Sequence, residues 1–393
     1  MSQEEFGLYG YLFAMVGYLA TLLNGGFYLV QSKLYFDYLP AKRGSILFTI
    51  NIILIGVLFV TIVVLIFFDI DKTFFELLFK HPFNYTIYRL PLLIGVFTTA
   101  YALMITQFFL ASGLIKKLQL FNILRSVLIH TTVLVILYLM PNLESSYIRI
   151  AGTYYVELII TAIFLVFLYR SMTFSFDWAI AKKAVSLSLP ITIYIIFSLV
   201  IFLIDRFYIE RLGSMKDLAI YNLAWVLAGV IPFISNSIHS IWLPELLKET
   251  DLRIVWSKAH SMGLKLLLGF SIISIGILVL VKLLLVLLII NPKYEEVIPV
   301  LPIVLLGSMV LSIFQLVFNY LLSISRIHVL VYISFGVAIV GVFITRELVL
   351  KWGLYGAAVS MLLMNLGLLI PSILCSIYFY KRQNLIYSHE NRN

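Results

Sequence analysis

Five ionisable side chains lie within long apolar runs of this sequence. They are Arg125, Glu157, Asp205, Arg206 and Lys282. The planar guanidinium of arginine forms paired hydrogen bonds with phosphate, and lysine offers a compact positive charge. A carboxylate in the same surroundings can take up a proton or a cation. Because charged groups are rare in membrane-spanning segments, these five residues are the first candidates for binding or ion transfer.

Each candidate also has a structural interpretation. The long side chains of Arg125, Arg206 and Lys282 can extend along a helix to the polar edge of a membrane. Glu157 can be neutral, or it can pair with an arginine of a neighbouring helix. Neighbouring residues point about 100° apart on a helix, so Asp205 and Arg206 need not pair with each other. The sequence alone leaves these alternatives open.

The composition places these residues in a membrane protein. The chain has 393 residues, of which 62% are hydrophobic and only 12% charged, and its mean hydropathy is +1.06. A soluble protein of this length could not keep its surface hydrated with so few charges. The apolar runs are continuous rather than alternating, which favours helices over a membrane barrel. The net charge of +9 is then better explained by basic cytoplasmic loops than by nucleic-acid binding.

We expect an all-α integral membrane protein with about eleven spanning helices, since about 20 apolar residues cross a bilayer. The predicted spans cover residues 8–31, 44–68, 89–111, 115–140, 147–169, 186–209, 218–243, 263–290, 297–323, 327–346 and 353–380. They are expected to form an N-terminal lobe (1–170) with five helices and a C-terminal lobe (186–381) with six. A cytoplasmic linker (171–185) joins the lobes, and a cytoplasmic tail (382–393) follows.

An internal repeat supports the two lobes. Glu4–Tyr9 (EEFGLY) aligns with Lys216–Tyr221 (KDLAIY), and His81–Gly95 aligns with Asn291–Gly307 at nearly the same offset. Matches at one offset indicate a repeat, although apolar helices can also resemble one another by chance. Each full half would hold an even number of helices, which makes the halves parallel repeats. The partner of helix 186–209 is then expected to precede Glu4.

The distribution of lysine and arginine predicts the orientation. Counting 32–43 as the first link, the odd-numbered links and the C-terminal tail hold most of these residues. The basic side of a membrane protein is usually cytoplasmic, so the C-terminus is expected inside and the N-terminus outside. No basic region precedes the first apolar run, so a cleavable signal peptide is not expected.

The sequence contains no pattern typical of an enzyme. The single Cys375 excludes a disulfide framework and a cysteine metal site. We find no glycine-rich phosphate loop and no group of residues with metal-ligand spacing, so no cofactor, no metal and no catalytic residue are predicted. His130 and His239 are more typical of core residues with satisfied hydrogen bonds than of ligands.

One stretch resembles a known family. It contains Asp205-Arg206 followed by Ile209, a link with Gly213, the string Ala219-Ile220-Tyr221-Asn222-Leu223-Ala224, and Pro244. This pattern resembles the polysaccharide-transporter family, the O-antigen and capsule flippases of the multidrug/oligosaccharidyl-lipid/polysaccharide exporter superfamily. Glu4–Tyr9 is similar to the link between the first two helices of that family. The sequence differs from the family pattern in two respects: it lacks the first helix, and it has Ala219 where glycine is usual.

The resemblance implies two lobes around a central cavity in the cytoplasmic (inner) membrane. The expected cargo is an undecaprenyl-diphosphate-linked oligosaccharide of O-antigen, lipopolysaccharide, capsule or exopolysaccharide synthesis, flipped by alternating access. Arg206, Arg125 and Lys282 would then bind the diphosphate, and Glu157 and Asp205 would couple transport to an ion. The expected partners are the lipid-linked substrate, membrane lipids, and glycan polymerase and chain-length machinery.

Three other functions stay open at this point. The chain could be a small-molecule or drug exporter of the same superfamily, although such exporters favour buried acids over the cations found here. It could be a membrane glycan polymerase or ligase, although no outer link is large enough for the usual catalytic loop. It could also be an inactive or regulatory membrane scaffold.

Overall fold

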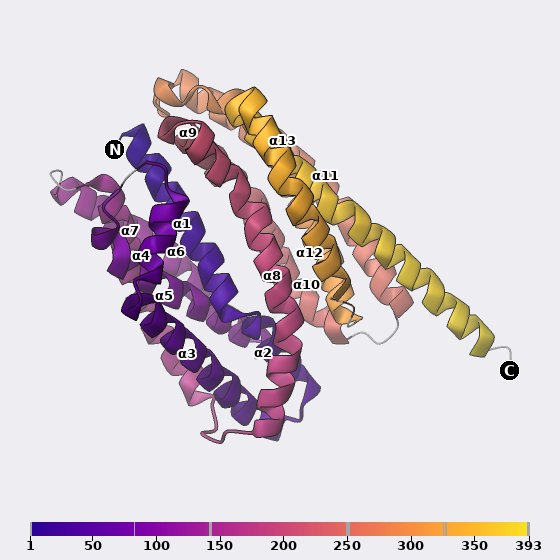
Figure 1. The fold of residues 1–393 in the computed structure, drawn as a ribbon. Helices are drawn as coiled ribbons and strands as arrows, with labels where there is room; N and C mark the ends of the chain where they lie inside the picture. The colour runs from indigo at the N-terminus through magenta and orange to yellow at the C-terminus, as the bar shows by residue number, and fades with distance from the viewer. Residues whose placement is uncertain are drawn as a thin grey trace. The chain divides into compact units, whose positions relative to one another are not determined.

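The computed structural model describes residues 2–81, 83–140, 144–248, 252–324, 326 and 328–390. Within these residues the chain is helical and has no strand (Figure 1). The α-helices are α1 (Gln3–Asn24), α2 (Phe27–Asp37), α3 (Arg43–Phe67), α4 (Ile70–Leu78), α5 (Tyr85–Ala111), α6 (Ile115–Leu139), α7 (Ser145–Arg170), α8 (Trp178–Leu212), α9 (Met215–Ala228), α10 (Val230–Lys248), α11 (Leu252–Val286), α12 (Val297–Ser323) and α13 (His328–Glu390). Short 3-10 turns cover Pro40–Lys42 and Pro292–Tyr294.

The expectation of an all-α membrane protein is confirmed. Ten helical segments among the described residues are long and apolar enough to cross a membrane. The last of them, His328–Lys381, contains the predicted spans 327–346 and 353–380. They are separated at Gly353, whose φ of 54° and ψ of −129° lie outside the helical region. The last two predicted spans are therefore two helices that meet at the turn at Gly353, within one of the ten segments.

The first predicted span, 8–31, is wrong as a single helix. Helix α1 ends at Asn24, and Gly25 and Gly26 adopt φ angles of +58° and +74°, which favour glycine. The Asn24 side chain accepts a hydrogen bond from the Tyr28 amide (3.1 Å) and donates one to the Ala100 carbonyl (3.0 Å). A second helix, α2, then continues to Asp37, into the region predicted as a link.

The chain folds as two compact units, Met1–Leu199 and Val200–Asn393, called unit 1 and unit 2 below. Helix α8 begins at Trp178, within the stretch expected to be a linker. The Asp177 carboxylate sets this start by accepting hydrogen bonds from the amides of Ala179 (2.8 Å) and Ile180 (3.2 Å). The predicted lobe boundaries stay a prediction.

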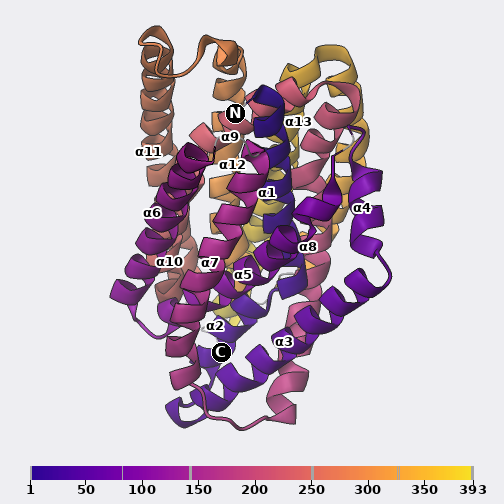
Figure 2. The same ribbon diagram turned by 90° about the vertical axis from the view of Figure 1, so that its left-hand side faces the viewer.

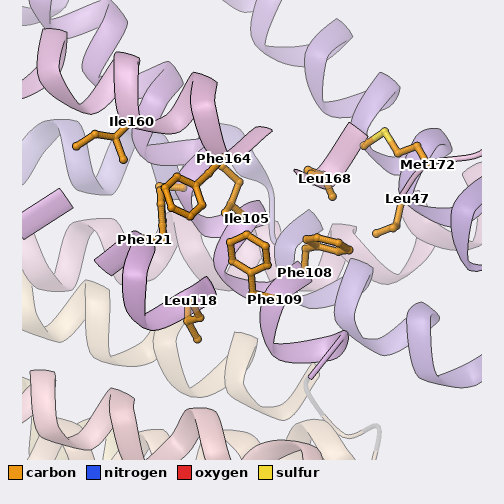
Figure 3. Close-up of a cluster of buried hydrophobic side chains, with 11 residues drawn as sticks. Leu47, Ile105, Phe108, Phe109, Leu118, Phe121, Ile160, Phe164, Leu168 and Met172 are labelled. Atoms are coloured by element: carbon orange, nitrogen blue, oxygen red, sulfur yellow. The ribbon is translucent and has the colours of Figure 1, made fainter. Parts of the chain in front are cut away.

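In unit 1, α5, α6 and α7 pack around an aromatic core, and Figure 2 shows α6 beside α7. Phe109, Phe121 and Phe164 come from these three helices and meet in this core (Figure 3). The Phe121 and Phe164 rings lie 5.0 Å apart in a tilted arrangement, which is a favourable aromatic geometry. This contact fixes how α6 and α7 are aligned along their lengths.

In unit 2, α12 and α13 pack closely through small residues (Figure 1). The Asn365 amide of α13 donates a hydrogen bond to the Gly307 carbonyl of α12 (3.1 Å). Within α13, the hydroxyls of Thr345 and Ser360, on either side of the turn at Gly353, lie 2.8 Å apart. A Cβ at Gly307 would lie 2.9 Å from the terminal methyl of Met361, so glycine lets this side chain pack closely against α12. Small residues and polar side-chain bonds are the usual means of helix association in membranes.

Candidate functional site

Arg125 and Glu157 meet between α6 and α7 in unit 1. The Nη2 atom of Arg125 donates a hydrogen bond to Oε1 of Glu157, and the two side chains form an ion pair. The Glu157 side chain is 3% exposed, whereas that of Arg125 is 32% exposed. Phe121 lies one turn before Arg125, so the aromatic core sets the depth at which the two charges meet. Of the alternatives for Glu157, the structure has the pair with a neighbouring arginine.

Asp205 and Arg206 are buried between α8 and α9 in unit 2, at 1% and 5% exposure. The Arg206 guanidinium lies 4.7 Å from the centre of the Trp225 ring and 5.5 Å from that of Tyr221. Its Nη1 atom is 3.7 Å from Asp205 and donates to the Phe202 carbonyl at 3.1 Å. Adjacent in sequence, Asp205 and Arg206 nonetheless form an ion pair.

The α8–α9 hairpin holds this pair in place. Asp205 also accepts a hydrogen bond from the Tyr221 hydroxyl. The turn is closed by Gly213, whose amide donates to the Ile209 carbonyl (2.9 Å). Ser214 and Asp217 then start α9 as a reciprocal cap, with amide-to-side-chain distances of 2.9 and 3.1 Å. The polar link that the sequence indicates is therefore a tight, capped turn.

Lys282 is exposed on α11. The same face of the helix carries Ile275, Val279 and Val286, which are 63%, 64% and 72% exposed. An apolar face of this kind is typical of lipid contact. The position of Lys282 therefore favours the interpretation in which its side chain extends to the headgroups, and its role in substrate binding stays a prediction.

Sequence reasoning missed an ion-pair network between α4 and α5. The buried Asp71 carboxylate accepts hydrogen bonds from Nε (2.8 Å) and Nη2 (2.9 Å) of Arg89 and from the Tyr85 hydroxyl (2.8 Å). Arg89 also pairs with Asp69 at 2.8 Å. From the sequence, Arg89 is interpreted only as one of the basic residues of the links that predict the orientation. The opposite charges on both sides of the 69–88 link were the signal that could have indicated this contact.

A second missed residue is Arg149, in the second turn of α7. Its guanidinium carbon lies 5.4 Å from the centre of the Tyr9 ring on α1. Its Nε atom is buried and has no hydrogen-bond partner among the described residues. Tyr9 is followed by Phe13, which stacks on Tyr154 of α7 with ring centres 6.3 Å apart. In the sequence Arg149 is indistinguishable from the basic residues of the links, because it lies only four positions after the start of its helix at Ser145.

His239 differs from its expected role as a satisfied core residue. It is 6% exposed, and its ring faces the backbone of Ser312, but neither ring nitrogen makes a hydrogen bond of good geometry within the part of the chain that the structure describes. The buried hydroxyls of Ser235, Ser308 and Ser312 in the same unit also lack protein partners there. Across the described residues, no three His, Cys, Asp or Glu side chains are grouped so that they could hold a metal ion.

Each unit also has an apolar cavity. In unit 1 a cavity of about 200 Å³ lies among α1, α3, α4 and α5, with Leu19, Ile62 and Phe74 in its wall. In unit 2 a cavity of about 300 Å³ lies among α11, α12 and α13, with Leu267 and Leu316 in its wall. Both linings suit hydrocarbon chains and offer few partners to a sugar.

Comparisons with known proteins identify the family that the sequence matches and the solved structures that have a similar fold. The sequence matches the family described as "Polysaccharide biosynthesis protein" over residues 1–250. No curated protein matches the chain in sequence. The fold is similar to that of an inward-facing multidrug resistance MATE family transporter of the MOP superfamily, with a TM-score of 0.71 and 14% identity, covering 97% of this chain and 91% of that chain. It is also similar to the lipid II flippase MurJ in an inward closed conformation, with a TM-score of 0.67 and 11% identity, covering 95% and 81%. At these identities the likeness shows the fold alone.

Proposed function

Because this chain belongs to the polysaccharide biosynthesis protein family, we propose that it is a transporter that flips a lipid-linked oligosaccharide across the membrane. The observation that carries this proposal is the match over residues 1–250, together with a fold like that of a lipid II flippase. The proposed carrier lipid is undecaprenyl diphosphate. The proposed glycan is a repeat unit of O-antigen, capsule or exopolysaccharide. No enzymatic step is part of this proposal.

The proposed mechanism is alternating access. Two lobes, the 1–170 and 186–381 parts of the chain, would enclose a cavity that opens first to the cytoplasm and then to the outside. The polar head group would pass through the cavity while the lipid tail stays in the bilayer, so no free energy is needed to transfer the tail into water. A diphosphate is costly to move through a medium of low dielectric constant, so cations along its route would lower the barrier.

The Arg125–Glu157 pair provides a means of coupling. The carboxylate of Glu157 and a substrate phosphate compete for the same guanidinium. Uptake of a proton by Glu157 would neutralise the carboxylate and leave Arg125, which is partly exposed, able to bind phosphate. Loss of that proton would restore the ion pair and release the phosphate. In this scheme Glu157 takes up one proton and releases it again for each substrate molecule that is moved.

Arg206, Asp205 and Lys282 have weaker support as contact residues. The Arg206 guanidinium is engaged by Asp205 and Trp225, so phosphate binding would require it to leave these contacts. We propose that the pair holds α8 against α9 and that substrate or ion binding at Arg206 and Asp205 accompanies a rearrangement of this hairpin. For Lys282 we propose a contact with the substrate diphosphate at the membrane surface.

We further propose the cytoplasmic (inner) membrane as the location, with the N-terminus outside and the C-terminus inside. The basis is the uneven distribution of lysine and arginine among the links. Glycan polymerase and chain-length machinery would use the flipped lipid on the outer side, and they are the proposed protein partners.

A second candidate function is export of small molecules or drugs. It is favoured by the several MATE transporters with a similar fold. Drug resistance on overexpression, with normal surface glycan, would support this alternative. A glycan polymerase or ligase would instead cause defects in glycan chain length without accumulation of the lipid-linked precursor.

Complementation tests the flippase proposal in cells. A bacterial strain from which the glycan flippase gene has been deleted accumulates precursor and displays no surface glycan. Expression of this chain in its native host background is expected to restore display and to clear the precursor. Failure to restore either one, with the protein present in the membrane, would count against the proposal.

A further inference from the structure

Arg149 is a cation inside unit 1 that has no anion of its own. Its guanidinium lies over the Tyr9 ring, with the guanidinium carbon 5.4 Å from the ring centre. Three other arginines of the spanning helices are paired with carboxylates: Arg89 with Asp71, Arg125 with Glu157 and Arg206 with Asp205. Among the described residues Arg149 has no ion pair and a buried Nε atom without a partner. An uncompensated charge of this kind is costly unless something else supplies the anion.

Two carboxylates at the junction of α1 with α7, those of Glu5 and Glu144, accept hydrogen bonds from other groups. Glu5 accepts hydrogen bonds from the amides of Ser2 (2.7 Å) and Ser145 (3.1 Å). Glu144 accepts from the hydroxyls of Tyr88 (2.5 Å) and Ser146 (2.7 Å). These bonds join α1 and α5 to the start of α7, and neither carboxylate forms an ion pair with Arg149 among the described residues.

The internal repeat provides a comparison within the same chain. Tyr9 aligns with Tyr221, and Phe13 aligns with Trp225 four residues later. In unit 2 an arginine, Arg206, covers this pair of rings and is neutralised by the neighbouring Asp205. In unit 1 the arginine over Tyr9 comes from another helix and brings no acid with it, and Phe13 is 47% exposed. The unit 1 site has the rings and the cation but lacks the anion.

We propose that Arg149, held by Tyr9, is a binding site for a phosphate-type anion, and that this anion is the diphosphate of the lipid-linked substrate. The inference rests on the proposed function and adds a residue that sequence reasoning did not select. A guanidinium stacked on an aromatic ring keeps its edge free for paired hydrogen bonds to phosphate oxygens. Arg149 lies near the helix end that contacts the N-terminus of α1, so the site would serve one side of the membrane.

Binding of a short polyprenyl diphosphate to the purified full chain in detergent tests this assignment. The probe is farnesyl diphosphate, with inorganic pyrophosphate and phosphatidylglycerol as competitors and farnesol as the uncharged analogue. Arg149→Gln is expected to weaken farnesyl diphosphate binding by about 10-fold or more, because charge-assisted hydrogen bonds are lost. The matched control is Arg346→Gln, which removes the same charge from an exposed pair with Glu347 and is expected to leave binding unchanged.

The competitors distinguish the sources of the anion. Pyrophosphate should compete with the probe and farnesol should not, since the site recognises the charged group. Equal competition by phosphatidylglycerol would assign the site to bulk phospholipid and overturn the proposal. Binding by Arg149→Gln as tight as that of the unmodified chain would overturn it as well.

Two further variants keep the test decisive if Arg149→Gln does not fold. Arg149→Lys retains the charge without the fork and is expected to bind a few-fold more weakly. Tyr9→Leu removes the ring that holds the guanidinium and is expected to weaken binding to a similar extent. Unchanged affinity in both variants would contradict the assignment. If the chain binds the diphosphate through Arg149 but flips no lipid, the proposed function is wrong and the binding site stands. If the chain flips lipid but Arg149→Gln binds the diphosphate as tightly as the unmodified chain, the proposed function stands and the binding site is wrong.

Discussion

The carboxylate of Glu157 on α7 accepts a hydrogen bond from the guanidinium of Arg125 on α6, so two charges from separate apolar runs neutralise each other within unit 1. The pair is asymmetric, since the acid is buried and the base is partly exposed. Removing the base therefore leaves a buried charge without its partner, whereas removing the acid leaves a charge whose long side chain is partly exposed and can extend toward a polar surface.

This asymmetry predicts different stability losses. Arg125→Leu is expected to lower the free energy of unfolding by about 3–5 kcal/mol, because it leaves the buried carboxylate unpaired. Glu157→Leu is expected to cost less. The double variant should recover most of the stability, since an apolar pair replaces an ion pair. Thermal unfolding of the purified variants in detergent measures the three effects, and additive losses in the double variant would show that the two side chains do not interact.

The glycine pair between α1 and α2 predicts a second contrast. Gly26→Ala places a side chain at a φ of +74° and brings its Cβ to 2.3 Å from Ile191. The left-handed conformation alone costs roughly 1–2 kcal/mol, and the contact adds to it. Gly17→Ala is the matched control, because nothing lies within 4 Å of its Cβ position inside α1. It is expected to leave the unfolding temperature unchanged or to raise it, and a comparable loss in both variants would contradict the proposed need for glycine at the break.

Arg206 allows a test of the α8–α9 hairpin. Arg206→Ala is expected to abolish transport, because Asp205 is 1% exposed and would lose its counter-charge. Arg206→Lys should retain part of the activity if positive charge is what matters, and little if the flat stacking on Trp225 is required. Lipid transport and thermal stability should be measured together on each variant. Transport by the Ala variant at the unmodified level would show that this residue is not part of the mechanism.

The distribution of basic residues predicts the topology. A fluorescent protein fused after the C-terminus should be fluorescent, and alkaline phosphatase fused there should be inactive, because the C-terminus is expected in the cytoplasm. Fusions in the 69–88 link, on the opposite side, should show the reverse behaviour. Active alkaline phosphatase at the C-terminus would invert the orientation proposed here.

Much of the fold could be predicted from the sequence, because spanning helices are continuous apolar runs and these are visible without tertiary information. The break at Gly25–Gly26 was missed since it lies inside an apolar run, with no polar link to mark it. The separation at Gly353 is the opposite case. A short polar stretch predicted a link there, and the chain turns at this residue with a helix on both sides.

The candidate site was predictable only in part. Arg125 and Glu157 could be selected as intramembrane charges, but their pairing depends on how the aromatic core aligns α6 with α7. Arg149 was overlooked because a charge near a helix end is ordinarily hydrated. Its isolation became apparent only from contacts between distant residues, with Glu5 bonded to the Ser145 amide and Tyr9 beneath the guanidinium.

Lipid flipping by the purified full chain in proteoliposomes tests the central claim most directly. The substrate is a fluorescently labelled oligosaccharide on undecaprenyl diphosphate, and a membrane-impermeant quencher reports which leaflet it occupies. We expect the quencher to reach label from both leaflets when the chain is present and only label of the outer leaflet in protein-free vesicles. Quenching limited to the outer leaflet, with folded protein confirmed in the same vesicles, would contradict it.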